Sequence, residues 1–122
     1  MKTTPNKGAL PDRFLRMLGL CRRAGGVIIG TSQVYEAMRG KRPPLLVIGS
    51  LHASEPTKKK TRTMCAFYKI PLITVPYTKE ELGKTVGKAG AISTLAVTDA
   101  RFKEEFITTR GEEVFPEGEA EV

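Results

Sequence analysis

The sequence predicts an α/β fold, a three-layer α/β/α sandwich with a mixed sheet of about four strands and about five helices. Two observations support this prediction. Segments whose apolar residues recur at helical spacing alternate with short apolar runs, and the links between them are short. One such run, residues 45–49, is almost continuously apolar, as in a strand covered on both faces of its sheet. A length of 122 residues suits one domain with a hydrophobic core.

The first helix is predicted from apolar residues at helical spacing between Phe14 and Leu18. Asp12 precedes them as a plausible N-cap, and the glycine pair at 25–26 ends the helix. Residues 1–10 contain few apolar side chains, so we expect a flexible lead-in there.

A very short strand is expected over residues 27–29, followed by a second helix from about Thr31 to Arg39. Gly40 ends this helix. The residues expected to face inward from it are Val34, Ala37 and Met38.

The middle of the chain predicts two strands, over residues 45–49 and 71–75, and a third helix that begins near Ser54. The apolar side of the third helix is expected to carry Met64, Cys65, Phe67 and Tyr68.

Thr78 and Glu81 are spaced as in a capping box, which predicts a short fourth helix. A loop rich in glycine covers residues 84–90, and the last strand is expected over residues 91–97.

Thr98 and Asp99 are expected to cap a final helix that ends near residue 108. The folded domain should therefore cover residues 11–109. The remainder, residues 110–122, is acidic and poor in apolar side chains, so we expect it to be disordered.

Charge is distributed unevenly along the chain. Residues 1–111 carry 20 basic and 8 acidic side chains, a net charge of +12, whereas the last eleven residues carry five glutamates. A body this basic indicates a polyanionic partner, and nucleic acid suits it better than a membrane because no large amphipathic basic helix is present. The alternative is an ordinary soluble, well-charged surface.

The sequence offers little for catalysis or metal binding. His52 is the single histidine, and no pair of acidic residues is placed for acid–base work. Residues 83–85 resemble the end of a phosphate-binding loop, but position 78 is a threonine where that loop needs glycine. Together with His52, the thiols Cys21 and Cys65 are too few and too scattered for a zinc site. We expect no enzyme, no cofactor and no metal, and two reduced structural thiols.

The apolar runs are far shorter than the roughly 20 residues that span a bilayer, and the first residues lead into no apolar signal region. We therefore expect a cytoplasmic protein.

The strongest candidate for a binding site is the start of the second helix. A glycine followed by small polar residues marks a helix N-terminus whose amides point outward, which suits a polyanion. The candidate residues are Gly30, Thr31, Ser32 and Gln33, with the nearby pair Arg22 and Arg23.

A second basic group, Lys58, Lys59 and Lys60 with Arg62, opens the third helix. Cations there oppose the helix dipole, so the group is either a solvated face or an auxiliary phosphate contact.

Five segments, in order, resemble the ribosomal protein L-seven-Ae family, whose members bind kink-turn RNA. They are LGLCRRAG at 18–25, GTSQ at 30–33, KKKT at 58–61, IPL at 70–72 and ELGKTVGK at 81–88, within a similarity that covers about residues 12–108. The chain looks closest to the small bacterial members.

The resemblance implies that the second helix reads tandem sheared G·A pairs through a Gly-x-Asn-Glu pattern, with a lysine three residues later. Gly30 and Thr31 fit this pattern. Ser32 stands in place of asparagine, Gln33 in place of glutamate, and Glu36 in place of lysine. A carboxylate at position 36 would repel phosphates, so it departs from the family where the charge matters.

The resemblance also implies that the loop before the last strand meets an extruded base, with an apolar side chain beneath the base and backbone amides near the bulge. The residues that match in kind are Val86, Gly87, Lys88, Ala91 and Ile92. Without the resemblance, these glycines would indicate a plain tight turn.

We therefore predict a non-enzymatic, monomeric protein that recognises kink-turn-like structured RNA, ribosomal or regulatory, with the ribosome as a further partner. The alternatives are an RNA-recognition module that works with a modifying enzyme and a protein-interaction module of the translation machinery.

Overall fold

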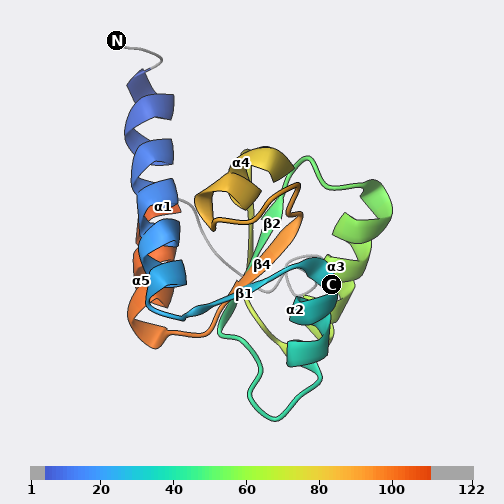
Figure 1. The fold of residues 1–122 in the computed structure, drawn as a ribbon. Coiled ribbons are helices and arrows are strands. Elements are labelled where there is room, and N and C mark those ends of the chain that lie inside the picture. The colour runs from blue at the N-terminus through green and yellow to red at the C-terminus, as the bar shows by residue number, and fades with distance from the viewer. Residues whose placement is uncertain (1–4, 111–122) are drawn as a thin grey trace.

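The computed structural model describes the backbone of residues 5–110 and the side chains of residues 13–109. The elements follow in the order α1 (Pro5–Arg23), β1 (Val27–Ile29), α2 (Thr31–Met38), β2 (Leu46–Ser50), α3 (Glu55–Tyr68), β3 (Leu72–Val75), α4 (Lys79–Thr85), β4 (Thr94–Val97) and α5 (Ala100–Arg110) (Figure 1).

The four strands form one mixed sheet in the order β1-β4-β2-β3. β2 and β3 are parallel, with Val47 opposite Leu72. β4 is antiparallel to both of its neighbours, and Ala96 lies opposite Ile28 on one side and Val47 on the other. β1, β2 and β3 therefore all end where β4 begins, which we call the carboxyl end of the sheet. The helices α2, α3 and α4 each follow one of these strands, so all three begin at this end.

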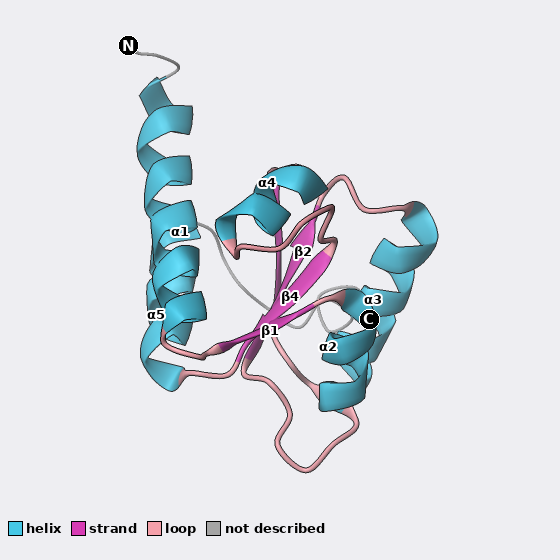
Figure 2. Cartoon of the chain, viewed as in Figure 1, coloured by secondary structure: helices cyan, strands magenta, loops and turns pink. Residues whose placement is uncertain are grey.

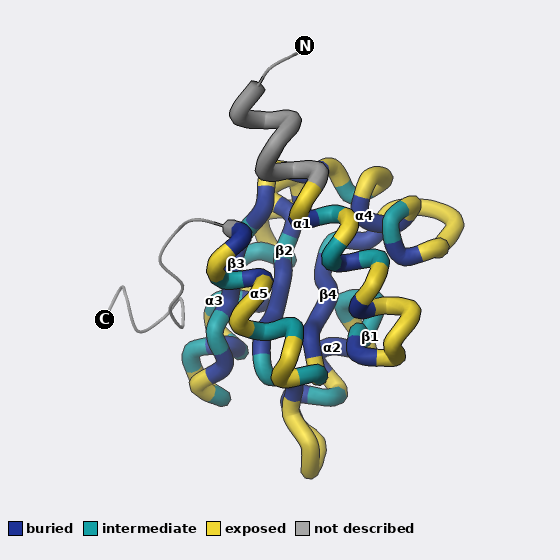
Figure 3. Tube along the Cα trace, turned by 90° about the vertical axis from the view of Figure 1, so that its left-hand side faces the viewer, coloured by how far each residue is buried: buried dark blue, intermediate teal, exposed yellow. Residues whose placement is uncertain are grey.

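Helices cover both faces of the sheet (Figure 2), which confirms the predicted α/β/α sandwich. Neighbouring strand residues point to opposite faces. Leu46 and Ile48 join a core with α1, α4 and α5, whereas Val47 joins a second core with α2 and α3. The central strands β2 and β4 are buried along most of their length (Figure 3), as the uninterrupted apolar run at residues 45–49 indicated.

α1 is longer than the sequence predicted. It begins at Pro5 instead of Asp12, so residues 5–10 extend the helix where a flexible lead-in was expected. Proline suits a first helical position because its missing N–H would have no partner there. Nothing in the sequence indicated this earlier start, because residues 1–10 contain few apolar side chains at helical spacing. From residue 111 onward, the segment that was expected to be disordered lies outside the described residues.

Two inward-facing predictions were partly wrong. In α2 the third buried residue is Tyr35, while Ala37 is only half-buried. In α3 Cys65 is buried and Met64 and Tyr68 pack beside it, but Phe67 is 74% exposed. Position 67 lies about 200° around the helix from position 65, so the two side chains cannot share a face.

The capped helix starts agree with the sequence. In α4 the Thr78 hydroxyl accepts from the Glu81 amide at 3.0 Å, and the Glu81 carboxylate accepts from the Thr78 amide at 2.8 Å, which confirms the capping box. At the start of α5 the Asp99 carboxylate accepts from the Arg101 amide at 2.9 Å. Hydrogen bonds from Arg101 also hold the pKa of Asp99 below its usual value.

Both cysteines are free and buried, as expected for structural thiols. Burial raises the pKa of Cys21 to about 11, with a further contribution from the negative charge of Asp99. The thiol therefore stays protonated at neutral pH. Within the described chain, no helix is both long and apolar enough to cross a membrane.

Candidate nucleic-acid interface

The start of α2 presents backbone amides at the carboxyl end of the sheet. Gly30 is the N-cap, with φ 105° and ψ 141°, a conformation that favours glycine. The first helical bond runs from the Val34 amide to the Gly30 carbonyl at 2.9 Å. Among the described residues no side chain caps the first turn of α2, so the amides of this turn point outward at the positive end of the helix dipole.

Ser32 and Gln33 are exposed on this first turn. The Gln33 Oε1 atom lies 2.5 Å from the position that a Cβ atom on Gly30 would take. Gly30 is needed for its backbone conformation, and the Gln33 side chain lies directly over it. The result is a compact polar surface of amide, hydroxyl and carboxamide groups.

Two hydrogen bonds join the start of α2 to the start of β4. The Gly30 amide donates to the Thr94 carbonyl, and the Thr31 hydroxyl donates to the Thr94 hydroxyl, each at 3.0 Å. They place the loop before β4 beside the helix N-terminus. Thr94 was missed by the sequence reasoning, and its one signal was its position next to the predicted loop.

The loop of residues 86–93 is anchored at both ends. The Lys88 amide donates to the Gly83 carbonyl at 2.8 Å, and the Ile92 amide donates to the Lys79 carbonyl at 2.9 Å. The second bond turns Ile92 toward α4, so β4 starts at Thr94 and not at residue 91.

The tip of this loop is exposed at Gly87, Lys88, Ala89, Gly90 and Ala91. Gly87 and Gly90 adopt positive φ angles of 74° and 94°. Among the described residues, the amides at 89–91 donate no hydrogen bond to another backbone group. The tip therefore offers free amides and one lysine to a ligand.

Val86 and Ile92 do not line this surface. They are only 2% and 8% exposed and belong to the core shared with α1 and α4. Their side chains fix the two ends of the loop, which leaves Ala91 as the exposed apolar residue of the predicted set.

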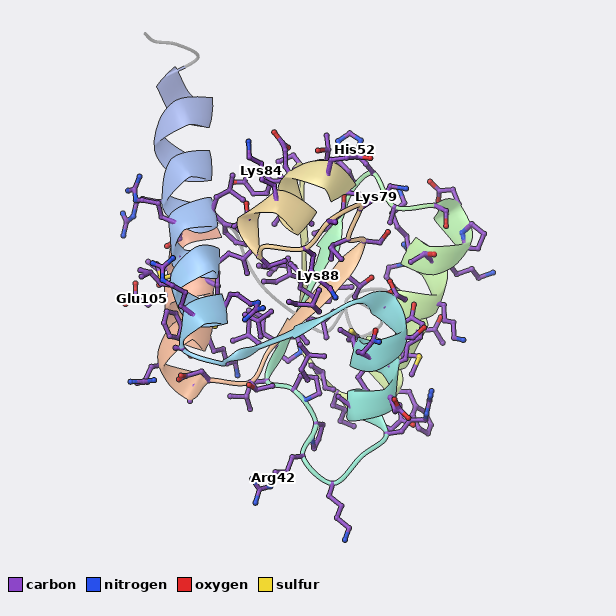
Figure 4. All side chains as sticks on the ribbon, in the orientation of Figure 1. Arg42, His52, Lys79, Lys84, Lys88 and Glu105 are labelled. Carbon is purple, nitrogen blue, oxygen red and sulfur yellow. The ribbon has the colours of Figure 1, made fainter. Side chains whose placement is uncertain are left out.

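Arg22 brings the end of α1 to the same region. Its Nε atom donates to the Val86 carbonyl at 3.1 Å, so its guanidinium lies beside the loop. Arg23 is exposed. Lys79 and Lys84 on α4 lie toward the top of the view and Lys88 on the loop lies near its middle (Figure 4), whereas Arg42 lies at the bottom, at the opposite end of the molecule. Lys79 and Lys84 were not among the predicted contacts, although both flank the capping-box helix.

The basic group on α3 is only partly free. Lys58 forms an ion pair with Glu55 at 3.0 Å and donates to the Leu51 carbonyl at 3.1 Å. The ammonium of Lys60 lies 5.1 Å from the centre of the Tyr35 ring. Lys59 is exposed and, among the described side chains, has no ion pair. Of Lys58 and Lys59, both predicted as RNA contacts, Lys59 is the one that remains available to a phosphate.

A cavity of about 230 Å³ opens beside this surface, between the sheet and the first turns of α3. Polar side chains line much of it, including Thr61, Thr74, Ser93 and Thr94, and Gly49 contributes to its wall. Thr94 contributes to the cavity and also bonds to Thr31 at the start of α2.

The residues considered above for catalysis lie apart from one another. His52 is exposed, with its Nε2 atom 3.1 Å from the Pro76 carbonyl. Residues 83–85 belong to helix α4 and form no phosphate-binding loop. The described residues contain no group of three histidine, cysteine or acidic side chains placed to hold a metal ion.

The family model of the ribosomal protein L7Ae/L30e/S12e/Gadd45 family matches residues 12–107. The RNA-binding protein YlxQ of Bacillus subtilis (strain 168) is 34% identical over 92 residues, covering 75% of this chain and 89% of that protein. The RNA-binding protein YlxQ of Enterococcus faecium is 27% identical over 77 residues, covering 63% of this chain and 73% of that protein.

Solved structures give the same picture. A protein of unknown function from Bacillus halodurans C has a TM-score of 0.74 at 33% identity, covering 82% of this chain and 98% of that one. The 15.5kD RNA binding protein of Giardia lamblia has a TM-score of 0.67 at 13% identity, covering 84% of this chain and 86% of that one, and shares the fold. Because the family model matches most of its length, the chain belongs to the ribosomal protein L7Ae/L30e/S12e/Gadd45 family.

Proposed function

We propose that this protein binds structured RNA of the kink-turn type, as a non-enzymatic binding protein. The observation that carries the proposal is the pair of bonds from Gly30 and Thr31 to Thr94, which joins the free helix N-terminus to the start of β4, directly after the loop whose tip is exposed. The names of the YlxQ relatives support RNA as the ligand. The net charge of +12 on residues 1–111 supports a polyanion.

In this proposal, Ser32 and Gln33 read base edges across the G·A pairs. The Gln33 carboxamide can donate and accept at once, whereas the Ser32 hydroxyl makes a shorter contact. The helix N-terminus favours the negative charge of the RNA. Arg22, Arg23 and Lys88 surround this surface and contact phosphates, which position the RNA without reading its sequence.

The loop tip receives an unpaired base in the same proposal. Ala91 supplies the apolar contact, and the free amides at 89–91 approach the bulge. The cavity beside Ser93 and Thr94 offers hydroxyl groups to the edge of an extruded base.

Gln33→Ala is expected to lower discrimination between a kink-turn and a variant that lacks its G·A pairs. A base-edge contact of this kind contributes about 1–3 kcal/mol, and the side chain is exposed, so the fold should be unaffected. Binding of both RNAs is measured by fluorescence anisotropy. Lys59→Ala is the matched control, because loss of a phosphate contact weakens both RNAs equally. Equal weakening of both RNAs by Gln33→Ala would show that Gln33 does not read bases.

Glu36→Lys is expected to raise the affinity for a standard kink-turn several-fold and to steepen its salt dependence. Glu36 is exposed one turn after Ser32, on the same face of α2. Among the described side chains it has no ion pair that the substitution would break. RNA titrations at two salt concentrations measure the change, and circular dichroism checks the fold. Unchanged affinity in a folded variant would mean that this face of α2 does not meet RNA.

A further inference from the structure

We infer that the outer face of α3 is a second contact surface for RNA, on which Phe67 stacks an unpaired base. This inference rests on the proposed function, since it assigns to the same RNA a single-stranded extension beyond the kink-turn. It begins from Phe67, which the sequence placed in the core and the structure leaves 74% exposed.

The Phe67 ring contacts Tyr68 and keeps a face open. It meets Tyr68 edge to face, with ring centres 4.9 Å apart and an angle of 87° between the rings. Tyr68 is half-buried and packs against the core of α2 and α3. Since one neighbour can cover at most one face of a ring, the exposed Phe67 has a face left for stacking.

Basic residues precede this ring along α3. Lys59, Thr63 and Phe67 follow one another at intervals of four residues and are all exposed, so they form one stripe. Arg62 is half-exposed beside the stripe. Neither Lys59 nor Arg62 forms an ion pair within the described chain, and Glu55 is the one acidic residue of α3.

Lys69 adds a cation beyond Phe67, at a position whose backbone conformation is unfavourable for lysine. It is the C-cap of α3 with φ 59° and ψ 46°, the left-handed conformation that glycine or asparagine usually fills. It is exposed. The ring therefore lies between cations on both sides along the helix.

The location of α3 makes the surface continuous with the proposed kink-turn site. The helix begins at the carboxyl end of the sheet and runs along the outer side of the molecule (Figure 1). Fourteen residues span about 20 Å. Cations that follow a backbone, combined with an aromatic platform, are the combination that binds single-stranded nucleic acid. A protein partner would not need so one-sided a charge.

A tryptophan reporter tests the inference directly, because the sequence contains no tryptophan. The F67W variant is titrated with three RNAs: a blunt kink-turn, the same kink-turn with an unpaired adenine-rich extension, and oligoadenylate alone. Stacking should quench the emission of F67W with the extended RNA and with oligoadenylate, but not with the blunt kink-turn. The matched reporter is L20W, because Leu20 is an apolar residue of α1 that is 49% exposed, and its emission should not change.

Affinity measurements separate stacking from simple apolar contact. Phe67→Ala and Phe67→Leu should each weaken the extended RNA at least about fivefold and leave the blunt RNA unchanged, whereas F67W should keep full affinity. The inference would be overturned if Phe67→Leu kept full affinity for the extended RNA. It would also be overturned if the emission of F67W stayed unquenched while anisotropy reported bound extended RNA. Either result would leave a protein as the partner of this ring. Quenching by oligoadenylate without binding of the blunt kink-turn would instead sink the proposed function alone.

Discussion

Gly83→Ala is expected to lower the free energy of unfolding by about 1–3 kcal/mol and to weaken kink-turn binding at least tenfold. Gly83 is buried in α4, and an added Cβ atom would overlap the carbonyl oxygen of Gly90 and crowd Ile92. The Gly90 carbonyl is backbone of the loop tip, so it cannot move aside without moving the tip. The substitution should therefore displace the amides at 89–91 that the proposed interface uses.

Gly19→Ala is the matched control for this prediction. Gly19 also lies inside a helix, but the nearest atom to an added Cβ is the Thr85 carbonyl oxygen at 3.9 Å, an ordinary contact. Removing a helical glycine without a clash should raise the free energy of unfolding by about 0.5–1 kcal/mol and leave RNA affinity unchanged. Urea unfolding and RNA titration of both variants measure the two effects. The same sign of stability change in both would contradict the packing of α4 on the loop.

Local signals in the sequence explain why most of the fold was predictable. The capping box of Thr78 and Glu81 and the buried run at residues 45–49 depend on residues close together in the chain. The helix start at Gly30 belongs to the same class, since the glycine and the polar residues after it mark an N-terminus without reference to the rest of the molecule. The structure therefore agrees with the predictions made from these local signals.

What the sequence did not predict depends on contacts between distant segments. The bond from Thr31 to Thr94 joins residues 63 apart, and no local pattern indicates it. Val86 and Ile92 look like apolar loop residues suited to a base, yet α1 and α4 bury them. Phe67 shows the reverse case, because Cys65 and its half-buried neighbours decide which side of α3 faces the sheet.

Kink-turn affinity is expected to fall about sixtyfold when the salt concentration rises fourfold. About four phosphate contacts give a slope of about −3 in a plot of log affinity against log salt concentration. The described cations around the interface include Arg22, Arg23, Lys84 and Lys88. The nearby Glu81 carboxylate already accepts a hydrogen bond from the Thr78 amide in the capping box. It therefore competes little with RNA phosphates for these cations.

Single substitutions assign this salt dependence to one end of the molecule. Lys88→Ala should reduce the slope by about one, because one fewer counterion is released on binding. Arg42→Ala removes the same charge from an exposed residue at the opposite end (Figure 4) and should leave the slope unchanged. Both slopes come from anisotropy titrations over a series of salt concentrations. Since general attraction to a basic body would treat the two positions alike, equal slopes in the two variants would argue against a defined interface at the carboxyl end of the sheet. A reduced slope in Lys88→Ala alone would locate the phosphate contacts at the loop that Gly83 and Thr94 hold in place.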